Sequence, residues 1–378
     1  MAAPHVPSPA PVAIVLPARE GFGPDSAGAV ALLVERLARA TLADPASRFA
    51  PVVFGTAQAR PVFADVPFIS VHPSWWPGTV SGRHAAGLVP LLRRMQPALV
   101  EVHNRPAVAL RLAARLGGSR IMLMLHNDPQ EMRGARSPAE RAALLGRLGR
   151  VVCVSAWLRA QLLEGVSAPA RAPAILPNCL DLAALPPAAP AEARDRTILF
   201  TGRLVPQKGA DAFVTACARA LPGLPGWTAE MIGADRFATN SPETAYIRTL
   251  RAAAEPAGIR LLGYRPHAEV LAALGRAAIA VVPSRWQEPF GLAALEALAM
   301  GAPLIAAPRG GLPEVAGNAA LYADPDDIPA LAAAISALAN DPARRAAAAA
   351  AGHTRARHFG LPEAAAALNA LRMECLPQ

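Results

Sequence analysis

The sequence predicts an α/β protein made of two facing, doubly wound parallel-sheet domains with a cleft between them. Three observations predict this. The chain has 378 residues, more than the roughly 250–300 that one hydrophobic core usually serves. Short β-branched apolar runs alternate with helical patterns along its whole length. An Ala- and Pro-rich stretch without periodicity, residues 181–193, separates two such series and is typical of a linker.

The first series alternates strands with helices such as residues 27–40 and 107–116. Its expected strands are residues 12–16, 51–54, 67–71, 99–102, 121–125 and 151–154.

The second series follows the linker and ends in an alanine-rich helical stretch from about Asp327. We expect an N-terminal domain over residues 1–184 and a C-terminal domain over 185–378, with a last helix, about 356–378, that could pack back on the first domain. Ligands of such sheets lie beyond the carboxyl ends of the strands. The expected strands are residues 197–200, 230–232, 260–262, 278–282 and 304–306, with helices beginning near Gly209, Pro242, Pro266, Phe290 and Asp327.

Composition excludes several classes of protein. Hydrophobic residues make up 53% and charged residues 17%, which excludes wholesale disorder. No apolar stretch is long enough for a membrane span, and residues 1–18 lack the basic leader of a secretory signal. The four cysteines form no Cys-x-x-Cys pair, so we expect a cytoplasmic protein without a disulfide framework or a structural metal.

Charge is unevenly distributed along the chain. The net charge is +9, of which the first 185 residues carry +8. A basic half suggests an anionic partner such as a membrane surface, a phosphorylated lipid or a nucleic acid; the alternative is that arginine is simply abundant. Trp75 and Trp76 lie in this half and could stack on a glycan, sit at a lipid interface or pack within a loop. Aromatic residues total 5% and no dense basic cluster is present, so we expect no nucleic-acid partner.

The densest motif runs from Pro283 to Glu296, between an apolar strand and a helix that is expected to open near Phe290. The backbone amides of Phe290, Gly291 and Leu292 would be unpaired donors at the positive end of that helix, which suits a phosphate. Glu288 and Glu296 would lie on nearly the same face, where a carboxylate can accept from two hydroxyls of a sugar or ribose diol. The alternative is two solvated acids on a surface helix.

The second motif, Gly202 to Gly209, follows the first strand of the second series. Arg203 and Lys208 could together stabilise the charge that grows on a departing diphosphate, so that a metal would be unnecessary. Lys208 is the only lysine in the chain. The alternative is two solvated loop cations.

Two features of the first half also lie at strand ends. Gly21-Phe-Gly23 superficially matches a dinucleotide fingerprint, but its third glycine and the later acid are missing, so NAD binding is not expected. A glycine loop that faces the other domain's phosphate site is the better interpretation. His103 and His126 follow two neighbouring strands and could each bind a sugar hydroxyl or remain ordinary core or loop residues.

These residues resemble the retaining glycosyltransferases of family 4, the glycogen-synthase-like group, which have two facing Rossmann-like domains (the GT-B architecture). Residues 202–209 resemble the family's donor-phosphate motif, and 288–296 its two glutamates separated by seven residues. Residues 310–314 resemble the loop that follows. The first half matches more loosely, and it departs from the pattern at Gly21-Phe-Gly23 and at Asn178-Cys179.

The resemblance implies a role for each matched residue. Arg203 and Lys208 would hold the diphosphate, and Glu296 would take the ribose hydroxyls. Glu288 and the amides of Phe290 to Leu292 would hold the donor sugar and its phosphate. His126 would face the sugar, Tyr264 or Arg265 would lie near the base, and Gly21 and Gly23 would line the sugar pocket; Trp75, Trp76 and His103 are candidates for docking an acceptor or a membrane.

The function implied is transfer of a hexose from a nucleotide diphosphate sugar, with retention and without metal or cofactor, to a glycan or lipid-linked glycan in cell-envelope polysaccharide or lipopolysaccharide synthesis. The enzyme would be bacterial and cytoplasmic, with peripheral association at the inner membrane face. Two alternatives stay open: a phosphorylase or sugar epimerase of the same architecture, and a non-catalytic nucleotide-sugar-binding protein. The sequence leaves the base, the hexose, the acceptor and the oligomeric state undefined.

Overall fold

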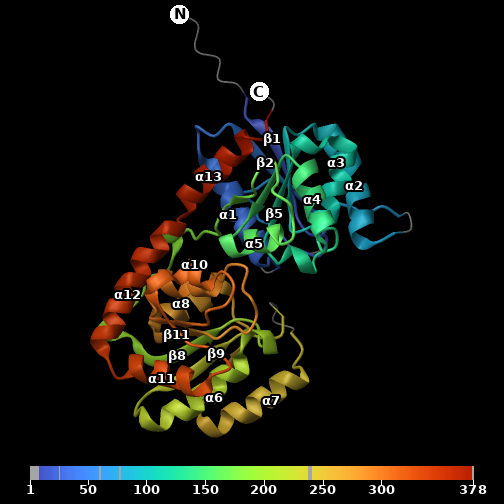
Figure 1. The fold of residues 1–378 in the computed structure, drawn as a ribbon. Coiled ribbons are helices and arrows are strands. Elements are labelled where there is room, and N and C mark those ends of the chain that lie inside the picture. Colours follow the sequence, from blue (N-terminus) through green and yellow to red (C-terminus); the bar gives the residue numbers. More distant parts are fainter. Residues whose placement is uncertain (1–7, 25, 59–60, 76–77, 237–240, 377–378) are drawn as a thin grey trace, which may run out of the picture. The chain divides into compact units, whose positions relative to one another are not determined.

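The computed structural model describes residues 8–24, 26–58, 61–75, 78–236 and 241–376. The chain forms two compact units, residues 1–179 with 361–378, and residues 180–360 (Figure 1). The first unit is therefore discontinuous in sequence, because helix α13 (Leu361–Met373) returns to it after the second unit is complete. The sequence places the boundary after residue 184, five residues later than these units do.

The first unit is built on a seven-stranded parallel sheet in the order β3-β2-β1-β4-β5-β6-β7. Its central strands β4 and β5 are buried at every position, as expected when helices cover both faces of a parallel sheet. The strands are β1 (Ala10–Val15), β2 (Phe49–Thr56), β3 (Phe68–Val71), β4 (Leu99–His103), β5 (Ile121–Leu125), β6 (Arg150–Cys153) and β7 (Ala174–Ile175).

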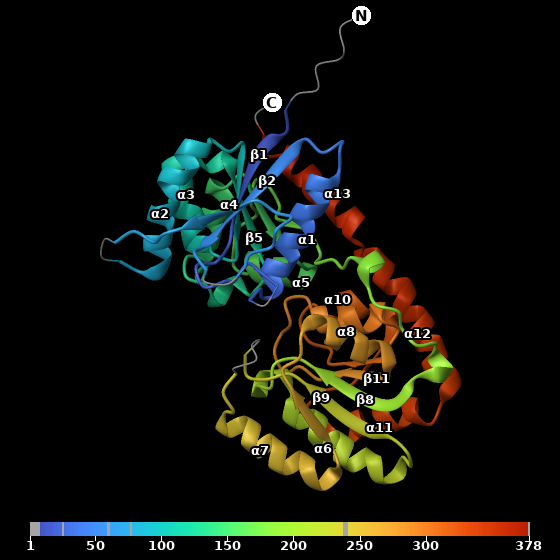
Figure 2. The same ribbon diagram turned by 180° about the vertical axis from the view of Figure 1, so that it is seen from behind.

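Helices cover both faces of this sheet (Figures 1 and 2). Helices α1 and α13 pack together on one face, in a core cluster with residues of β1, β4, β5 and β6. Helices α2 and α3 pack on each other and on the opposite face. The start of α4 is fixed by a capping box between Ser137 and Glu140, which satisfies two otherwise unpaired amides. The bounds are α1 (Ala29–Ala43), α2 (Val80–Met95), α3 (Pro106–Leu116), α4 (Pro138–Arg147) and α5 (Ala156–Leu163).

A buried ion pair fastens α13 to the first sheet. Arg372 Nε lies 2.5 Å from Glu101 Oε1, and its Nη2 lies 3.2 Å from Oε2. Both side chains are at most 1% exposed. Nη1 of Arg372 donates to Thr41 Oγ1 and Asn369 Oδ1, so that both charged groups are satisfied inside the core.

The second unit is built on a six-stranded parallel sheet in the order β10-β9-β8-β11-β12-β13. The central strand β11 is a continuous buried apolar run. The strands are β8 (Asp195–Thr201), β9 (Thr228–Ile232), β10 (Arg260–Gly263), β11 (Ala277–Val282), β12 (Leu304–Ala306) and β13 (Ala320–Tyr322).

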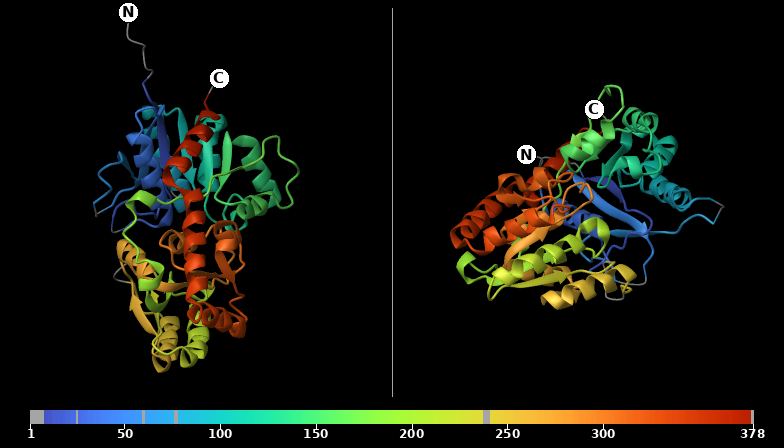
Figure 3. Two further views of the ribbon diagram at one scale, coloured as in Figure 1. Left: turned by 90° about the vertical axis from the view of Figure 1, so that its left-hand side faces the viewer. Right: turned by 60° about the horizontal axis from the view of Figure 1, so that its bottom comes forward.

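Its helices also cover both faces, and Figure 3 shows each unit's sheet between its helices from two further directions. Helices α6, α7 and α11 share one core cluster with β8, β9 and β11. Helices α8, α9 and α12 pack on the other face. The bounds are α6 (Ala210–Ala220), α7 (Ala245–Ala254), α8 (His267–Arg276), α9 (Leu292–Ala299), α10 (Leu312–Ala316), α11 (Ile328–Ala339) and α12 (Pro342–Ala356).

The structure confirms the expected fold class of two doubly wound parallel sheets and adds detail at their edges. The edge strands β7 and β13 have only two and three residues, too few for a recognisable sequence pattern. The alanine-rich C-terminal stretch forms three helices rather than one continuous segment. None of the helices in the described part of the chain is both long and apolar enough to cross a membrane.

Candidate active site

The first part of the site in the second unit is the loop after β8. It closes with a 3-10 turn, Pro206–Lys208, and Gly209 then starts α6 in the left-handed conformation (φ 67°). A Cβ at Gly209 would lie 1.8 Å from the carbonyl oxygen of Pro283, the residue after β11. Only glycine allows this approach, so the sequence at 209 brings the Lys208 turn against the end of β11.

Lys208 and Glu288, both predicted site residues, meet at this point. Lys208 Nζ lies 2.6 Å from Glu288 Oε1, and the ammonium lies 4.9 Å from the centre of the Trp286 ring. The Glu288 side chain is 8% exposed and that of Lys208 22%. The pair is thus a half-buried, charge-assisted hydrogen bond with an aromatic wall beside the cation.

The loop that carries Glu288 is hydrogen-bonded to Gly310 and Gly311, which precede α10. The amide of Gly311 donates to the Glu288 carbonyl at 2.6 Å, and that of Gly310 donates to Gln287 Oε1 at 2.7 Å. These bonds leave the Glu288 carboxylate free to face Lys208.

Helix α9 begins at Leu292, two residues later than its expected opening near Phe290. The reason is Gly291, which is left-handed (φ 103°) and caps the helix. Phe290 is buried. Among the described residues, none accepts a hydrogen bond from the amides of Phe290, Gly291 or Leu292. The three expected donors are therefore present, although two of them precede the helix.

Glu296 lies inside α9 and has a partner that the sequence does not suggest. Its Oε1 lies 2.7 Å from Nε2 of His267, the first residue of α8. The Glu296 side chain is 12% exposed and that of His267 34%. His267 therefore fixes one oxygen of the carboxylate, and the second oxygen is available to a ligand hydroxyl.

The remaining predicted residues of this unit are less constrained. Arg203 is half-buried in the loop after β8, and no side chain in the described ranges pairs with it. Tyr264, at the end of β10, lines a pocket of about 290 Å³ together with Gly263 and Arg251. Among the described residues, the pairing of Arg265 is limited to a long ion pair, 3.8 Å, with Glu269 on α8.

In the first unit, His103 and His126 form a buried pair. His103 Nδ1 lies 3.0 Å from His126 Nε2. Burial, reinforced by the charge of Arg372, lowers the pKa of His103 to about 3. Burial and the neighbouring His103 hold the pKa of His126 well below its ordinary value. Both rings are therefore neutral at neutral pH, one donating and the other accepting.

This pairing changes the grouping that the sequence suggests. His103 is 3% exposed, so the structure groups it with His126 and not with Trp75, a candidate for docking that is 78% exposed. Trp76 lies outside the described residues. Asn104 joins the two strand ends, because its Oδ1 accepts from the amide of His126 at 3.1 Å.

Gly21 and Gly23 lie in the loop between β1 and α1. Gly21 forms an isolated parallel bridge with Ala27. The backbone of Pro61 lies so close to Gly23 that a Cβ would come within 2.1 Å of its oxygen. Both glycines thus allow a tightly folded loop at the carboxyl end of β1.

Two residues that contact the predicted site residues were not predicted from the sequence, His267 and Trp286, and a third, Arg285, contacts the turn that precedes Lys208. Trp286 and Arg285 lie inside the motif 283–296, whose position after β11 is the sequence signal for both. His267 lies 29 residues from Glu296, and no local pattern connects them.

Chemically, the second unit carries several candidate ligands for an anion and two candidate carboxylates for hydroxyls. A flexible ammonium, a guanidinium and three amides at Phe290 to Leu292 can bind phosphate oxygens. Glu288 and Glu296 can accept from hydroxyls.

Comparison with known families accounts for most of the chain. Residues 30–184 match the profile described as "Glycosyltransferase Family 4", and residues 185–355 match "Glycosyl transferases group 1". The second match includes every candidate residue of the second unit.

Two curated relatives illustrate the similarity. The chain is 36% identical over 175 residues to glycogen synthase from Mycobacterium tuberculosis, which is 45% of this chain and 40% of the relative. It is 32% identical over 177 residues to the lipopolysaccharide core biosynthesis mannosyltransferase LpsB from Rhizobium meliloti, or 45% and 49% of the two chains. The matched region thus spans less than half the length of these relatives.

Solved structures share the fold over nearly the whole chain. Sucrose-phosphate synthase from Thermosynechococcus elongatus superposes with a TM-score of 0.78 at 20% identity, covering 96% of this chain and 98% of its own. HepE from Anabaena, solved in complex with UDP-glucose, gives 0.72 at 17% identity, with 95% and 98% covered.

Proposed function

Because the chain belongs to the family 4 glycosyltransferases and has their GT-B fold, we propose that it transfers a hexose from a nucleoside diphosphate sugar to a glycan or lipid-linked glycan. The reaction proceeds with retention of the anomeric configuration and serves the synthesis of cell-envelope polysaccharide or lipopolysaccharide. The observation that carries the proposal is the Lys208–Glu288 pair at the carboxyl ends of β8 and β11. It places a cation for the leaving group beside a carboxylate for the sugar.

In this proposal the protein accelerates departure of the diphosphate. Lys208, Arg203 and the amides of Phe290 to Leu292 stabilise the negative charge that develops on the phosphate oxygens as the glycosidic bond breaks. Preorganised donors of this kind contribute about 10²–10³-fold each to turnover. Two cations can take over the charge stabilisation that a divalent metal would provide, so the reaction needs no metal.

Retention is proposed to occur by attack on the face from which the diphosphate departs. The acceptor oxygen forms the new bond to the anomeric carbon, the phosphate oxygen keeps the electrons of the broken bond, and the same phosphate takes the acceptor's proton. No carboxylate nucleophile is needed. Glu288 holds sugar hydroxyls, Glu296 holds the ribose, and His126 binds the sugar as a neutral imidazole.

The nucleoside is proposed to lie at the carboxyl ends of β9 and β10. The pocket of about 290 Å³ beside Tyr264 is large enough for a base, and Arg265 lies next in sequence. UDP-glucose is the first donor to test, because the fold neighbour HepE was solved with it. Similarity to LpsB, a lipopolysaccharide core biosynthesis mannosyltransferase, supports a lipopolysaccharide-type acceptor.

The first experiment is thermal-shift screening against UDP, GDP and ADP and their hexose conjugates, each in EDTA and in magnesium. A ligand that binds only the folded state raises the apparent stability, by about 2.7 kcal/mol at 100 times its Kd. We expect a shift with one nucleotide that EDTA does not abolish. If no nucleotide shifts the transition, the donor site and the transferase reaction are both rejected.

Proton NMR of the reaction then separates the alternatives. A retaining transferase consumes the donor only with an acceptor or, slowly, with water, and it forms a product of the donor's anomeric configuration. A phosphorylase would turn over with inorganic phosphate, and an epimerase would convert the nucleotide sugar alone. A protein that binds the nucleotide and never consumes the sugar would be a binding protein.

Membrane association is a separate part of the proposal. The exposed Trp75 and the net charge of +8 in residues 1–185 favour contact with an anionic surface. Sedimentation with vesicles of anionic and of neutral lipid tests it. Binding to anionic vesicles at low salt, weakened by Trp75→Ala, is expected; no sedimentation would remove this part and leave the transferase proposal intact.

A further inference from the structure

The turn that carries Lys208 is joined to the loop after β11 through one carbonyl group. The Gln207 oxygen accepts hydrogen bonds from the amides of Arg285 and Trp286, both at 2.9 Å, and from Ser284 Oγ at 3.2 Å. Three donors from consecutive residues thus converge on one acceptor. Since Gln207 precedes Lys208, these bonds fix the backbone from which the lysine side chain extends.

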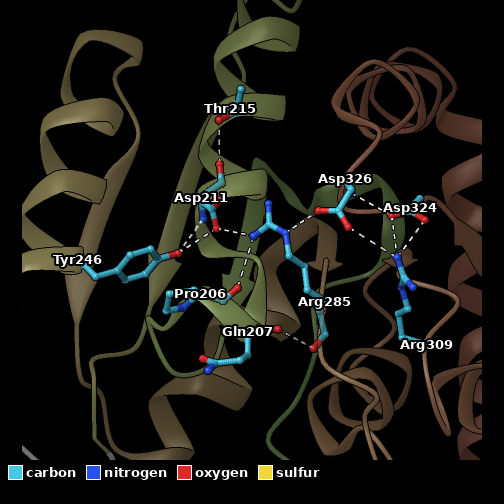
Figure 4. Close-up of polar contacts among 10 residues, drawn as sticks. Pro206, Gln207, Asp211, Thr215, Tyr246, Arg285, Arg309, Asp324 and Asp326 are labelled. Atoms are coloured by element: carbon cyan, nitrogen blue, oxygen red, sulfur yellow. Dashed lines mark hydrogen bonds and ion pairs between the residues drawn. The ribbon is translucent and has the colours of Figure 1, made fainter.

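The side chain of Arg285 extends this connection to two further segments (Figure 4). Its Nη1 lies 2.7 Å from Asp211 Oδ1, in the first turn of α6. Its Nε lies 2.6 Å from Asp326 Oδ1, in the loop before α11. Nη1 also approaches the carbonyl of Pro206 at 3.4 Å. The guanidinium therefore contacts residues on both sides of Lys208 in the sequence.

The contact with Asp211 is electrostatically strong for a partly exposed pair. Burial raises the pKa of the Asp211 carboxyl, but hydrogen bonds from Arg285 and Tyr246 outweigh this and lower it below its ordinary value. The Tyr246 hydroxyl donates to the same oxygen at 2.9 Å, as Figure 4 shows. Asp211 is thereby held in its ionised form against Arg285.

We propose that Arg285 is a positioning residue, which clamps the 206–208 turn against the loop 284–288 and so holds the Lys208 ammonium between Trp286 and Glu288. Among the described residues, the Arg285 guanidinium contacts Asp211, Asp326 and the Pro206 carbonyl, and none of the proposed donor-binding residues. We therefore infer that its contribution to turnover passes through the position of Lys208. The tests of this inference that use turnover rest on the proposed function, and the test by NMR below does not.

Lys208 is the only lysine in the chain, which gives a readout that needs no activity. Reductive methylation with ¹³C-formaldehyde labels Lys208 and the amino terminus, and Lys208→Arg identifies the lysine signal by its loss. The ring current of Trp286 displaces this signal from its position in a free lysine. We expect Arg285→Ala to move it toward the free position, and an unchanged signal in a folded variant overturns the proposal.

Arg309→Ala is the matched control. The Arg309 side chain is 29% exposed, against 30% for Arg285. It also pairs with the 324–326 loop, through Asp324 at 3.1 and 3.2 Å, but it makes no contact with the 206–208 turn among the bonds of the described residues. Its loss should leave the Lys208 signal in place. If both variants move the signal equally, the effect is general loosening and the proposal fails.

Two milder variants keep the test valid if Arg285→Ala does not fold. Asp211→Asn weakens the guanidinium's contact with α6 and leaves the backbone bonds to Gln207 intact. Arg285→Lys keeps a charge but cannot bond Asp211 and Asp326 together in the same fork geometry. Each should move the signal part of the way, and a signal that neither variant displaces counts against the proposal.

A double-mutant cycle measures the coupling in turnover, followed as release of nucleoside diphosphate. We expect Arg285→Ala to lower kcat at least tenfold in the wild-type chain and less than threefold in a Lys208→Ala background. Equal losses in both backgrounds would show an independent effect and overturn the proposal. Absence of turnover in the wild type would reject the proposed function, while the NMR test would still decide the position of Lys208.

Discussion

Lys208 and Glu288 neutralise each other across 2.6 Å, at the position where the proposed function requires a cation for phosphate. A bound diphosphate and the Glu288 carboxylate therefore compete for one ammonium group. Because the Glu288 carboxylate holds the ammonium and also repels the negative phosphates, removal of its charge should make the cation more available to the nucleotide.

Glu288→Gln tests this competition. We expect the Kd for nucleoside diphosphate to fall about 3- to 10-fold, since a tenfold change corresponds to about 1.4 kcal/mol. Turnover should fall at least 100-fold, because the amide holds the sugar poorly. Isothermal titration and donor consumption measure the two effects. Weaker nucleotide binding in this variant would contradict the competition, and Glu255→Gln, at an exposed acid that follows α7, is the control.

Lys208→Ala is expected to reduce kcat about 10²–10³-fold, the usual loss for one preorganised donor to a developing negative charge. The melting temperature should also fall, because the substitution leaves the Glu288 carboxylate, which is 8% exposed, without its ammonium partner; kcat is therefore compared at a temperature at which both chains are folded. Lys208→Arg should recover only part of the activity, since a planar guanidinium cannot follow a moving phosphate as an ammonium does. Wild-type turnover in the alanine variant would remove Lys208 from the mechanism.

His267 should act on donor binding through Glu296. Without His267 Nε2, the carboxylate loses the partner 2.7 Å away that fixes one oxygen. We expect His267→Ala to raise the KM for donor about 3- to 10-fold with a smaller change in kcat, in line with about 1 kcal/mol for a hydrogen bond of this kind. His267→Gln keeps an N–H and should restore much of the KM. Glu296→Ala should lower turnover strongly, and a His267→Ala chain with unchanged KM would show that Glu296 orients itself without help.

The Glu101–Arg372 pair should dominate the attachment of α13. Glu101→Ala leaves an uncompensated guanidinium that is 0% exposed, so we expect a loss of about 3–5 kcal/mol from the unfolding free energy. Replacing both residues, Glu101→Leu with Arg372→Met, should recover much of that loss. The exposed acid Glu374, paired with Arg171 and Arg150, provides the control, with at most about 1 kcal/mol lost. Urea unfolding measures the free energy of unfolding of all three variants. Equal losses of that free energy on substitution of Glu101 and of Glu374 would contradict a dominant role for the Glu101–Arg372 pair.

Acid should destabilise the first unit through its buried histidines. The pKa of His103 is about 3 in the folded chain and about 6.5 in an unfolded one. Between these values the unfolded state binds the extra proton, so stability falls as the pH falls from about 6.5 toward 3, by up to about 1.4 kcal/mol per pH unit. His103→Gln should make this dependence less steep, while the exposed His358→Gln should not. Unfolding curves between pH 4 and 7 with identical slopes for wild type and His103→Gln would exclude this mechanism.

The sequence predicted the core of the fold because its signals are local. Buried runs such as Ile121–Leu125 and Ala277–Val282 have no other interpretation in a chain with regular helical patterns between them. Boundaries were less accurate, since a single left-handed residue, Gly291, shifted the start of α9. The family assignment depended on the motifs 202–209 and 288–296, and the profile matches confirm it.

The partners within the site could not be predicted in the same way. His267 reaches Glu296 only because α8 and α9 pack together in the folded unit. Arg285 reaches Asp211 across 74 residues, and His103 meets Nε2 of His126 because their strands are neighbours in register. Such contacts follow from tertiary geometry, which no short pattern in the sequence encodes.

The discontinuity of the first unit has a consequence for how the protein is made. A ribosome delivers residues 1–179 first, then the whole of 180–360, and only then the helix α13 that completes the first core with Leu361, Ala365 and Leu368. The synthesis of the second unit is therefore complete before that of the first unit, which still lacks α13 at that time. Until α13 has been synthesised, the face of the first sheet that it covers exposes apolar surface together with the Glu101 carboxylate, the partner of Arg372. We therefore expect a stop codon after residue 360 to destabilise the first unit, most of which lies before residue 180, and to leave the second unit with all of its residues.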